Sequence, residues 1–175
     1  MRLFFRFTPF AMAMLYAVMV LSSCASDNIH EGDDTSTTST TDYIDGSLSS
    51  SIPAFPSFQP VVCQDFAIID ISDANNDGTM NAKITIGAFD IYVNVINRKF
   101  SIGTMVIEDM ECTQDADGFY SFSKSDTECQ AGDYLAKINN IKGTYRDGVL
   151  ALEMEYKLGT MPFFIKSVFS NNVGM

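Results

Sequence analysis

Residues 149–158 read Val-Leu-Ala-Leu-Glu-Met-Glu-Tyr-Lys-Leu. Every second side chain is apolar, at Leu150, Leu152, Met154, Tyr156 and Leu158, and the residues between them are Ala, Glu and Lys. This alternation is typical of a β-strand with one face in the core and the other in water. The pair Asp147-Gly148, just before the stretch, suits the positive φ angles of a tight hairpin turn. The segment therefore predicts a half-buried strand that follows a hairpin.

The same pattern recurs along the chain. Asp77-Gly78 and Asp117-Gly118 also precede β-rich runs, and no segment has the apolar spacing of an amphipathic helix. We expect strands near residues 61–72, 79–96, 100–113, 119–125, 134–145, 149–158 and 163–170. Short connections make them antiparallel, and closure would remove exposed edges. The expected fold is all-β: a small antiparallel meander β-barrel, or a strongly curved sheet, of seven or eight strands.

The composition changes before residue 61. Residues 31–42 are acidic, rich in Ser and Thr, and free of hydrophobic periodicity. Such a stretch buries too little apolar surface to offset its ordering entropy. We therefore expect a disordered tether over residues 24–60 and a barrel domain over residues 61–172.

The first 23 residues have the organisation of an export leader. Arg2 and Arg6 precede an uncharged apolar run from Pro9 to Leu21, which is too short for the ~20 residues of a membrane span. Leu21-Ser22-Ser23-Cys24 resembles the lipobox of bacterial lipoproteins, whose cysteine is acylated. The resemblance implies lipid attachment at Cys24 and anchoring in the outer membrane, on its periplasmic or surface face. Cleavage after Ala25 is the alternative.

Charge and composition argue against several functions. The net charge of −11 disfavours nucleic-acid binding, and the single histidine, His30, lies in the expected tether. Histidine-dependent catalysis and histidine-containing zinc sites in the domain are thereby excluded, and we expect no enzyme, cofactor or metal. Residues 73–78 begin like a calcium loop, but Ile84 stands where such a loop needs Glu, so a hairpin turn is favoured.

Cysteine pairing depends on the path of the chain near Gly87. If Cys24 is acylated, Cys63, Cys112 and Cys129 permit one disulfide at most. A kink at Gly87 within one long strand would place Cys63 and Cys129 at the same barrel end. A turn at Gly87 would instead bring Cys63 and Cys112 to one end.

From about Cys63 to Asn171 the domain resembles the calycin-like β-barrel domain of outer-membrane lipoproteins of gut-type Gram-negative bacteria. The matching segments are residues 77–79, 102–104, 141–144, 147–152 and 159–163. The resemblance implies a short lipocalin-like barrel without catalysis, and one long strand through Gly87, hence a candidate disulfide between Cys63 and Cys129. We expect the barrel to bind a small apolar or glycan-like ligand. The alternative is a solid barrel that docks a protein partner at the cell surface, and an apolar cavity would discriminate between them.

Overall fold

The computed structural model describes residues 39–55, 60–73, 78–93 and 96–171. These residues form ten strands: β1 (Ser39–Ser51), β2 (Val61–Ser72), β3 (Met80–Ile86), β4 (Phe89–Val93), β5 (Arg98–Ile102), β6 (Met105–Gln114), β7 (Tyr120–Ala131), β8 (Tyr134–Arg146), β9 (Val149–Leu158) and β10 (Ile165–Ser170). Within the described ranges no helix is long and apolar enough to cross a membrane.

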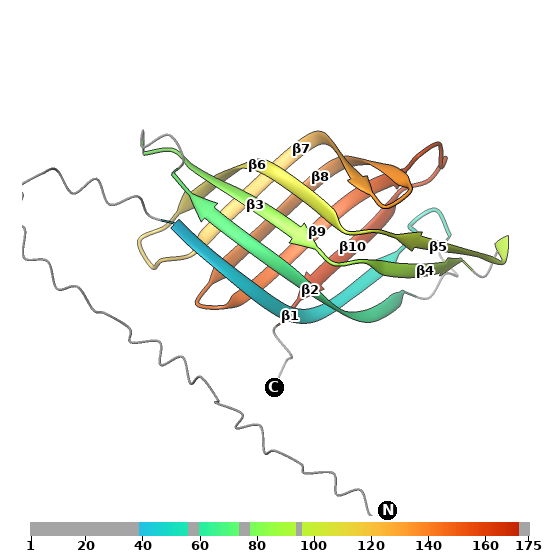
Figure 1. Cartoon of the computed structure of the whole chain (residues 1–175), viewed down its shortest axis with the longest axis horizontal. Coiled ribbons are helices and arrows are strands. Elements are labelled where there is room, and N and C mark those ends of the chain that lie inside the picture. Colours follow the sequence, from blue (N-terminus) through green and yellow to red (C-terminus); the bar gives the residue numbers. More distant parts are fainter. Residues whose placement is uncertain (1–38, 56–59, 74–77, 94–95, 172–175) are drawn as a thin grey trace, which may run out of the picture. The chain divides into compact units, whose positions relative to one another are not determined.

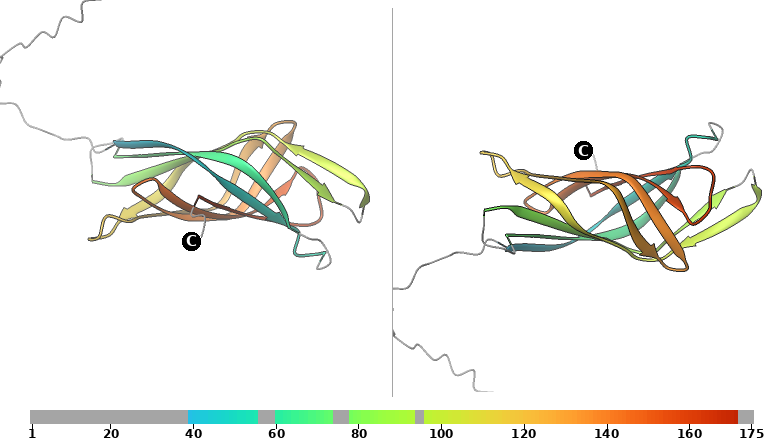
Figure 2. Two further views of the ribbon diagram at one scale, coloured as in Figure 1. Left: turned by 90° about the horizontal axis from the view of Figure 1, so that it is seen from below. Right: turned by 90° about the horizontal axis from the view of Figure 1, so that it is seen from above.

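Eight strands close into an antiparallel barrel in the order β1-β10-β9-β8-β7-β6-β3-β2 (Figure 1). The expected barrel is therefore confirmed, and the strands expected at residues 61–72 and 149–158 have those bounds. In Figure 2 the strands on the two sides of the barrel cross each other steeply. This steep crossing is the consequence of the strong coiling that closure of a small barrel requires.

The first strand corrects the expected domain boundary. Residues 39–51, which we assigned to the disordered tether, form β1, which pairs with β2 from Ser39↔Ser72 to Ser50↔Val61 and with β10. The strand was missed because its inward positions are not uniformly apolar: Gly46 and Ser50 alternate with buried Leu48. The barrel thus includes residues 39–51, and the tether residues before them lie outside the described part of the chain.

Gly87 interrupts a long strand and does not form a hairpin turn. β3 pairs with β2 and β6, whereas β4 pairs with β5 to form a separate two-stranded sheet. In Figure 1 this hairpin extends beyond the end of the barrel. The glycine is required because a Cβ atom there would lie 2.1 Å from Asp65 Oδ1 and 2.8 Å from the Phe66 ring. The kink that we expected from the family resemblance is therefore present.

Three neighbouring strands each contain an irregularity at the same level. The register shifts between β3 and β6 near Asp109, between β6 and β7 near Asp126, and between β8 and β9 at Asn139. Asp109 and Asp126 both have a φ of +51°. β-Bulges of this kind bend a strand and increase its twist. They let β6, β7 and β8 curve around one side of the barrel.

Two aromatic rings in the core lie against glycines. A Cβ atom at Gly46 would lie 2.6 Å from the Phe169 ring, and one at Gly143 would lie 2.4 Å from the Phe122 ring. Both rings are buried. A glycine under an aromatic ring permits sharp coiling while the ring restores the lost packing. These pairs help the sheet to close.

Candidate functional site

The interior of the barrel is filled by side chains. Among the largest fully buried residues are Tyr156, Phe169, Leu48, Ile69, Ile84, Met105 and Met110. Polar groups in this interior satisfy one another: Ser50 Oγ lies 2.8 Å from Ser167 Oγ, and the Tyr156 hydroxyl lies 3.2 Å from the same atom. Burial raises the pKa of the Tyr156 hydroxyl. These residues occupy the space in which a barrel of eight strands would otherwise hold a small ligand.

The structure places Cys63 and Cys129 at one barrel end and Cys112 at the other, where it pairs with Met80 and Phe122. All three are free thiols, and Cys63 Sγ donates to the Leu48 carbonyl at 3.7 Å. Burial raises the pKa of each thiol, that of Cys129 to about 11. Cys63 and Cys129 lie at the same barrel end, as a kink at Gly87 implies. A disulfide between them stays a prediction. Cys24, the expected lipid attachment site, lies outside the described residues.

The sequence that begins like a calcium loop connects β2 to β3. Asp73 Oδ2 accepts a hydrogen bond from the Gly78 backbone N–H at 2.9 Å, as an aspartate does when it closes a turn. Residues 74–77 lie outside the described chain. Among the described residues, no three His, Cys, Asp or Glu side chains are placed to hold a metal ion.

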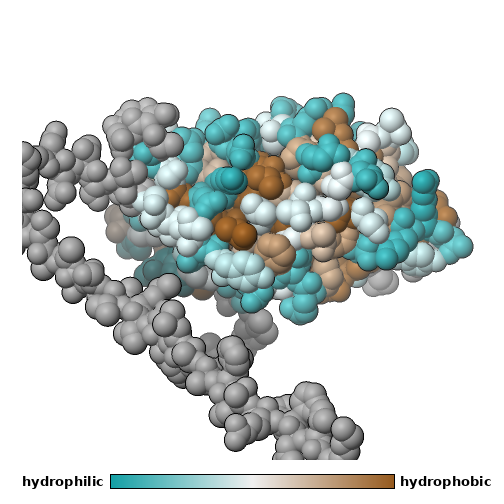
Figure 3. All heavy atoms as spheres, in the orientation of Figure 1, coloured by the Kyte–Doolittle hydropathy of each residue, from teal (hydrophilic) through white to brown (hydrophobic). Residues whose placement is uncertain are grey.

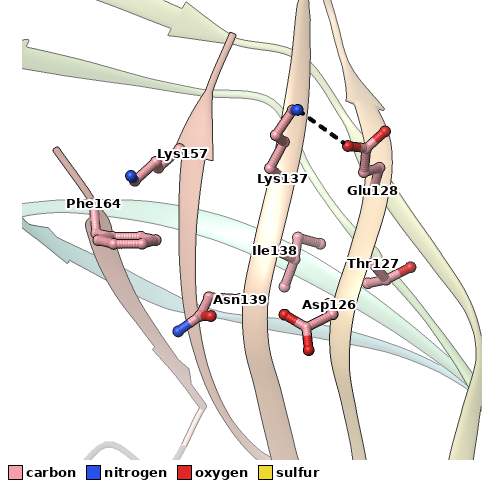
Figure 4. Close-up of a pocket in the computed structure, with 8 residues that line it drawn as sticks. All are labelled: Asp126, Thr127, Glu128, Lys137, Ile138, Asn139, Lys157 and Phe164. Carbon is pink, nitrogen blue, oxygen red and sulfur yellow. Dashed lines mark ion pairs between the residues drawn. The ribbon is translucent and has the colours of Figure 1, made fainter. Parts of the chain in front are cut away.

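A hollow of about 310 Å³ lies on the outside of the barrel, over β7, β8, β9 and the connection to β10. Figure 4 shows the eight residues that line it: Asp126, Thr127, Glu128, Lys137, Ile138, Asn139, Lys157 and Phe164. Two bulge positions, Asp126 and Asn139, contribute to its wall. Because bulges re-aim side chains out of the regular pleat, the hollow follows from the curvature of this side.

The charged groups of the hollow are held in place by one another and by an aromatic ring. Lys137 Nζ lies 3.4 Å from Glu128 Oε1, and Asn139 Nδ2 donates to Glu155 Oε1 at 2.9 Å. Lys157 Nζ lies 4.1 Å from the centre of the Phe164 ring. Such exposed cation–π contacts are worth only about 0.5–1 kcal/mol, so a ligand could displace the ammonium from the ring at small cost.

The hollow thus combines ammonium and amide donors, carboxylate acceptors and one aromatic face. This mixture suits a ligand that carries many hydroxyl groups on an apolar ring frame, since such a ligand needs donors, acceptors and a stacking surface together. These residues form no recognisable motif in the sequence. They are spread over four segments, and only the fold brings them together.

Comparison with known proteins supports the architecture. No family model and no curated protein matches the chain. A crystal structure of a "putative outer membrane protein" from Bacteroides fragilis is similar, with a TM-score of 0.54 and 15% sequence identity. The match covers 78% of this chain and 50% of that one, so the chain spans about half of its neighbour's length. The similarity agrees with a calycin-like barrel and extends to the fold alone.

Proposed function

We propose that this protein is a non-catalytic binding module, held at the outer membrane by lipid on Cys24, whose barrel binds a glycan-like ligand in the hollow on its outer face. The observation that carries the proposal is the hollow of about 310 Å³, which is lined by Lys137, Asn139, Lys157 and the Phe164 ring, with the Lys157 ammonium over the ring. Its size and mixed lining suit one or two sugar units.

The filled interior is the reason for placing the ligand outside. Leu48, Met105 and Phe169 have 0% exposure, and the buried hydroxyl groups already have hydrogen-bond partners. An apolar ligand inside the barrel would have to displace this core, and cores at native packing density resist such insertion. We therefore favour the glycan-like ligand over the apolar one.

The membrane assignment rests on the sequence and on the neighbour. The charged n-region, the apolar run and the tetrad ending at Cys24 have the order of a lipoprotein leader. The structural neighbour from Bacteroides fragilis bears the description "putative outer membrane protein". Both support a location at the outer membrane. For catalysis we propose none, because residues 39–171 contain no histidine, and carboxylates such as Glu128 and Glu153 form ordinary ion pairs with lysines.

Binding to an array of neutral and acidic oligosaccharides tests this function. The full-length chain in detergent should retain a subset of glycans, and Phe164→Ala and Asn139→Ala should each weaken retention several-fold. Lys83→Ala is the control outside the hollow, because Lys83 pairs with Glu108 elsewhere on the barrel and should not affect retention. Retention unchanged in the hollow variants, or an apolar molecule found by native mass spectrometry, would contradict the proposal.

A second function, docking of a protein partner, is favoured by one observation. Tyr43 on β1 is 61% exposed and stacks on Phe66 of β2, with ring centroids 5.1 Å apart. Over the face shown in Figure 3, hydrophobic side chains form small groups separated by hydrophilic ones. Loss of a co-purifying protein in Tyr43→Ser, with glycan retention intact, would favour this alternative.

A further inference from the structure

The barrel sheet contains a split between residues 61–65 of β2 and β4, because the chain after Gly87 no longer pairs with β2. Pairing of β2 with β3 runs from Ser72↔Asn81 to Ala67↔Ile86, and the last bond is from Gly87 N–H to the Phe66 carbonyl at 3.0 Å. Beyond it, β4 pairs with β5 only, so β2 over residues 61–65 keeps β1 as its single described neighbour. Among the described residues, one edge of this half of β2 therefore has no pairing partner.

The direction of the unpaired groups follows from the ladder. The Phe66 carbonyl faces β3, and alternate residues of a strand present their main-chain groups to the same side. Val62 and Gln64 therefore direct their N–H and C=O groups into the split. Both side chains are exposed, and Val62 is 63% exposed. Main-chain groups that lack a partner among the described residues, as these do, form a template for another strand.

Asp65 occupies the apex of the split. Its Oδ1 accepts the Phe66 N–H at 2.8 Å, the bond that a continuing β3 would have made. Its Oδ2 is shielded from solvent and has no hydrogen-bond partner in the described part of the chain. A buried acceptor left in this state is costly, and a donor from an incoming chain would satisfy it. A charged donor, such as an ammonium or guanidinium group, makes a stronger hydrogen bond to a carboxylate than a neutral donor does.

We propose that the split between β2 and β4 is a docking site for an extended, basic segment of another protein, which adds as a strand beside residues 61–65. Strand addition supplies affinity through main-chain hydrogen bonds, here to Val62 and Gln64, and specificity through side chains. A lysine or arginine of the segment reaches Asp65. The acidic charge of the chain, −11, favours a basic partner over an acidic one.

The probe is an acetylated and amidated peptide of alternating lysine and valine, added to the full-length chain in detergent micelles. We expect it to shift the amide signals of Val62 and Gln64 in a ¹⁵N spectrum and to slow their hydrogen exchange. A peptide of alternating glutamate and valine should bind much more weakly, and so should the lysine peptide with methylated backbone nitrogens, because methylation removes the donors.

Two variants separate the main chain from the side chain. Gln64→Pro deletes an N–H that faces the split and leaves the bonds to β1, so it should fold and bind the peptide at least about tenfold more weakly. Gln64→Ala keeps the N–H and should bind like the wild type. Asp65→Asn should weaken binding of the lysine peptide and reduce its salt dependence.

Equal binding by Gln64→Pro and Gln64→Ala would overturn the proposal, and so would exchange protection that maps elsewhere on the barrel. If Gln64→Pro does not fold, the comparison of methylated and unmethylated peptides on the wild type decides, and equal binding of the two overturns it. The glycan experiment is independent, since the hollow lies over β7–β9, and each proposal can fail alone.

Discussion

Gly143 shows how one residue permits the barrel to close. It lies in β8 with its α-carbon turned toward the interior, where the Phe122 ring covers it. Any side chain at this position would have to displace a buried aromatic ring. Glycine is therefore needed at position 143 because no side chain fits there. At Gly148 glycine is needed for a different reason, since the turn requires a φ of +78°.

We predict that Gly143→Ala destabilises the barrel by about 1–3 kcal/mol, the usual cost of overpacking a core. A Cβ atom would lie 2.4 Å from the Phe122 ring, closer than the two can approach. Urea unfolding followed by far-UV circular dichroism measures the change. Thr144→Ala, an exposed neighbour on the same strand, is the control and should be nearly neutral. Equal free energies of unfolding for both variants would show that the ring moves aside freely.

The thiols offer a second test at the residue scale. Cys63 and Cys129 share one end of the barrel, and Cys112 lies at the other, buried beside Phe122. If the exported protein forms the bridge, alkylation in the unfolded state followed by peptide mapping should label Cys112 and spare the other two. Labelling of all three would show free thiols. In that case native labelling should be slow at pH 8, because burial raises the pKa of Cys129 to about 11 and leaves little thiolate.

At the scale of elements, β9 carries the alternation that first indicated the fold. Leu152 is 2% exposed, whereas the neighbouring Glu153 carboxylate lies on the outside, 2.7 Å from Lys166 Nζ. Leu152→Ala should therefore cost ~2–5 kcal/mol and Glu153→Ala less than about 1 kcal/mol, since exposed ion pairs contribute little. Thermal or urea unfolding of the two variants measures the difference. Similar, small losses at both positions would mean that the core at β9 is loosely packed.

Most strands could be predicted from alternation, and the exceptions have physical reasons. β1 could not be predicted because two of its inward positions, Gly46 and Ser50, are not apolar. The Phe169 ring of β10 packs over Gly46, and the Ser167 hydroxyl of β10 hydrogen-bonds to Ser50. Such compensation is a tertiary effect that no local pattern reveals. β7 extends to Ala131, whereas the sequence predicted its end at residue 125. The prediction stopped short because the bulge at Asp126 interrupts the alternation of apolar and polar residues.

The bulges are visible in the sequence as a change in the spacing of apolar residues. Apolar residues that face the core are separated by three positions, and not by two, between Ile107 and Met110 and again between Ile138 and Ile141. Each step of three marks an extra residue in the strand, since a regular strand keeps a period of two. This spacing indicates an irregularity at Asn139, which lines the hollow. The other lining residues Lys157 and Phe164 could not be predicted, because they come from other segments of the chain.

At the scale of the whole barrel, Tyr145 joins two strands that are not neighbours. Its hydroxyl donates to Asp42 of β1, whereas β8 is separated from β1 by β9 and β10. Burial and this hydrogen bond raise the pKa of Tyr145 from 10.0 to about 12. Above pH 10 the unfolded chain therefore loses a proton that the folded chain retains. The contribution to stability is complete below pH 10 and falls as the pH rises toward 12.

We accordingly predict that the free energy of unfolding of the wild type decreases more steeply between pH 10 and 12 than that of Tyr145→Phe. At pH 7 the variant should be about 1 kcal/mol less stable, owing to the lost hydrogen bond. Urea titrations at a series of pH values measure both quantities. Tyr92→Phe is the control, because Tyr92 is exposed on the β4–β5 hairpin. Parallel pH profiles for wild type and Tyr145→Phe would contradict the assignment.

Anchoring concerns the whole chain and depends on Cys24, far from the barrel in sequence. If this thiol carries lipid, the wild-type protein should fractionate with membranes and incorporate a fatty-acid analogue. Each methylene of the acyl chains that enters the bilayer adds ~0.8 kcal/mol to the free energy of membrane binding, so several chains on one cysteine give stable anchoring. Cys24→Ser should be soluble and unlabelled, with a barrel of unchanged stability because the described strands, from Ser39 onward, do not include residue 24. Cys112→Ser controls for the loss of a thiol in general. A wild-type protein found soluble and unlabelled would instead favour ordinary cleavage after Ala25, and the barrel would then act free of the membrane.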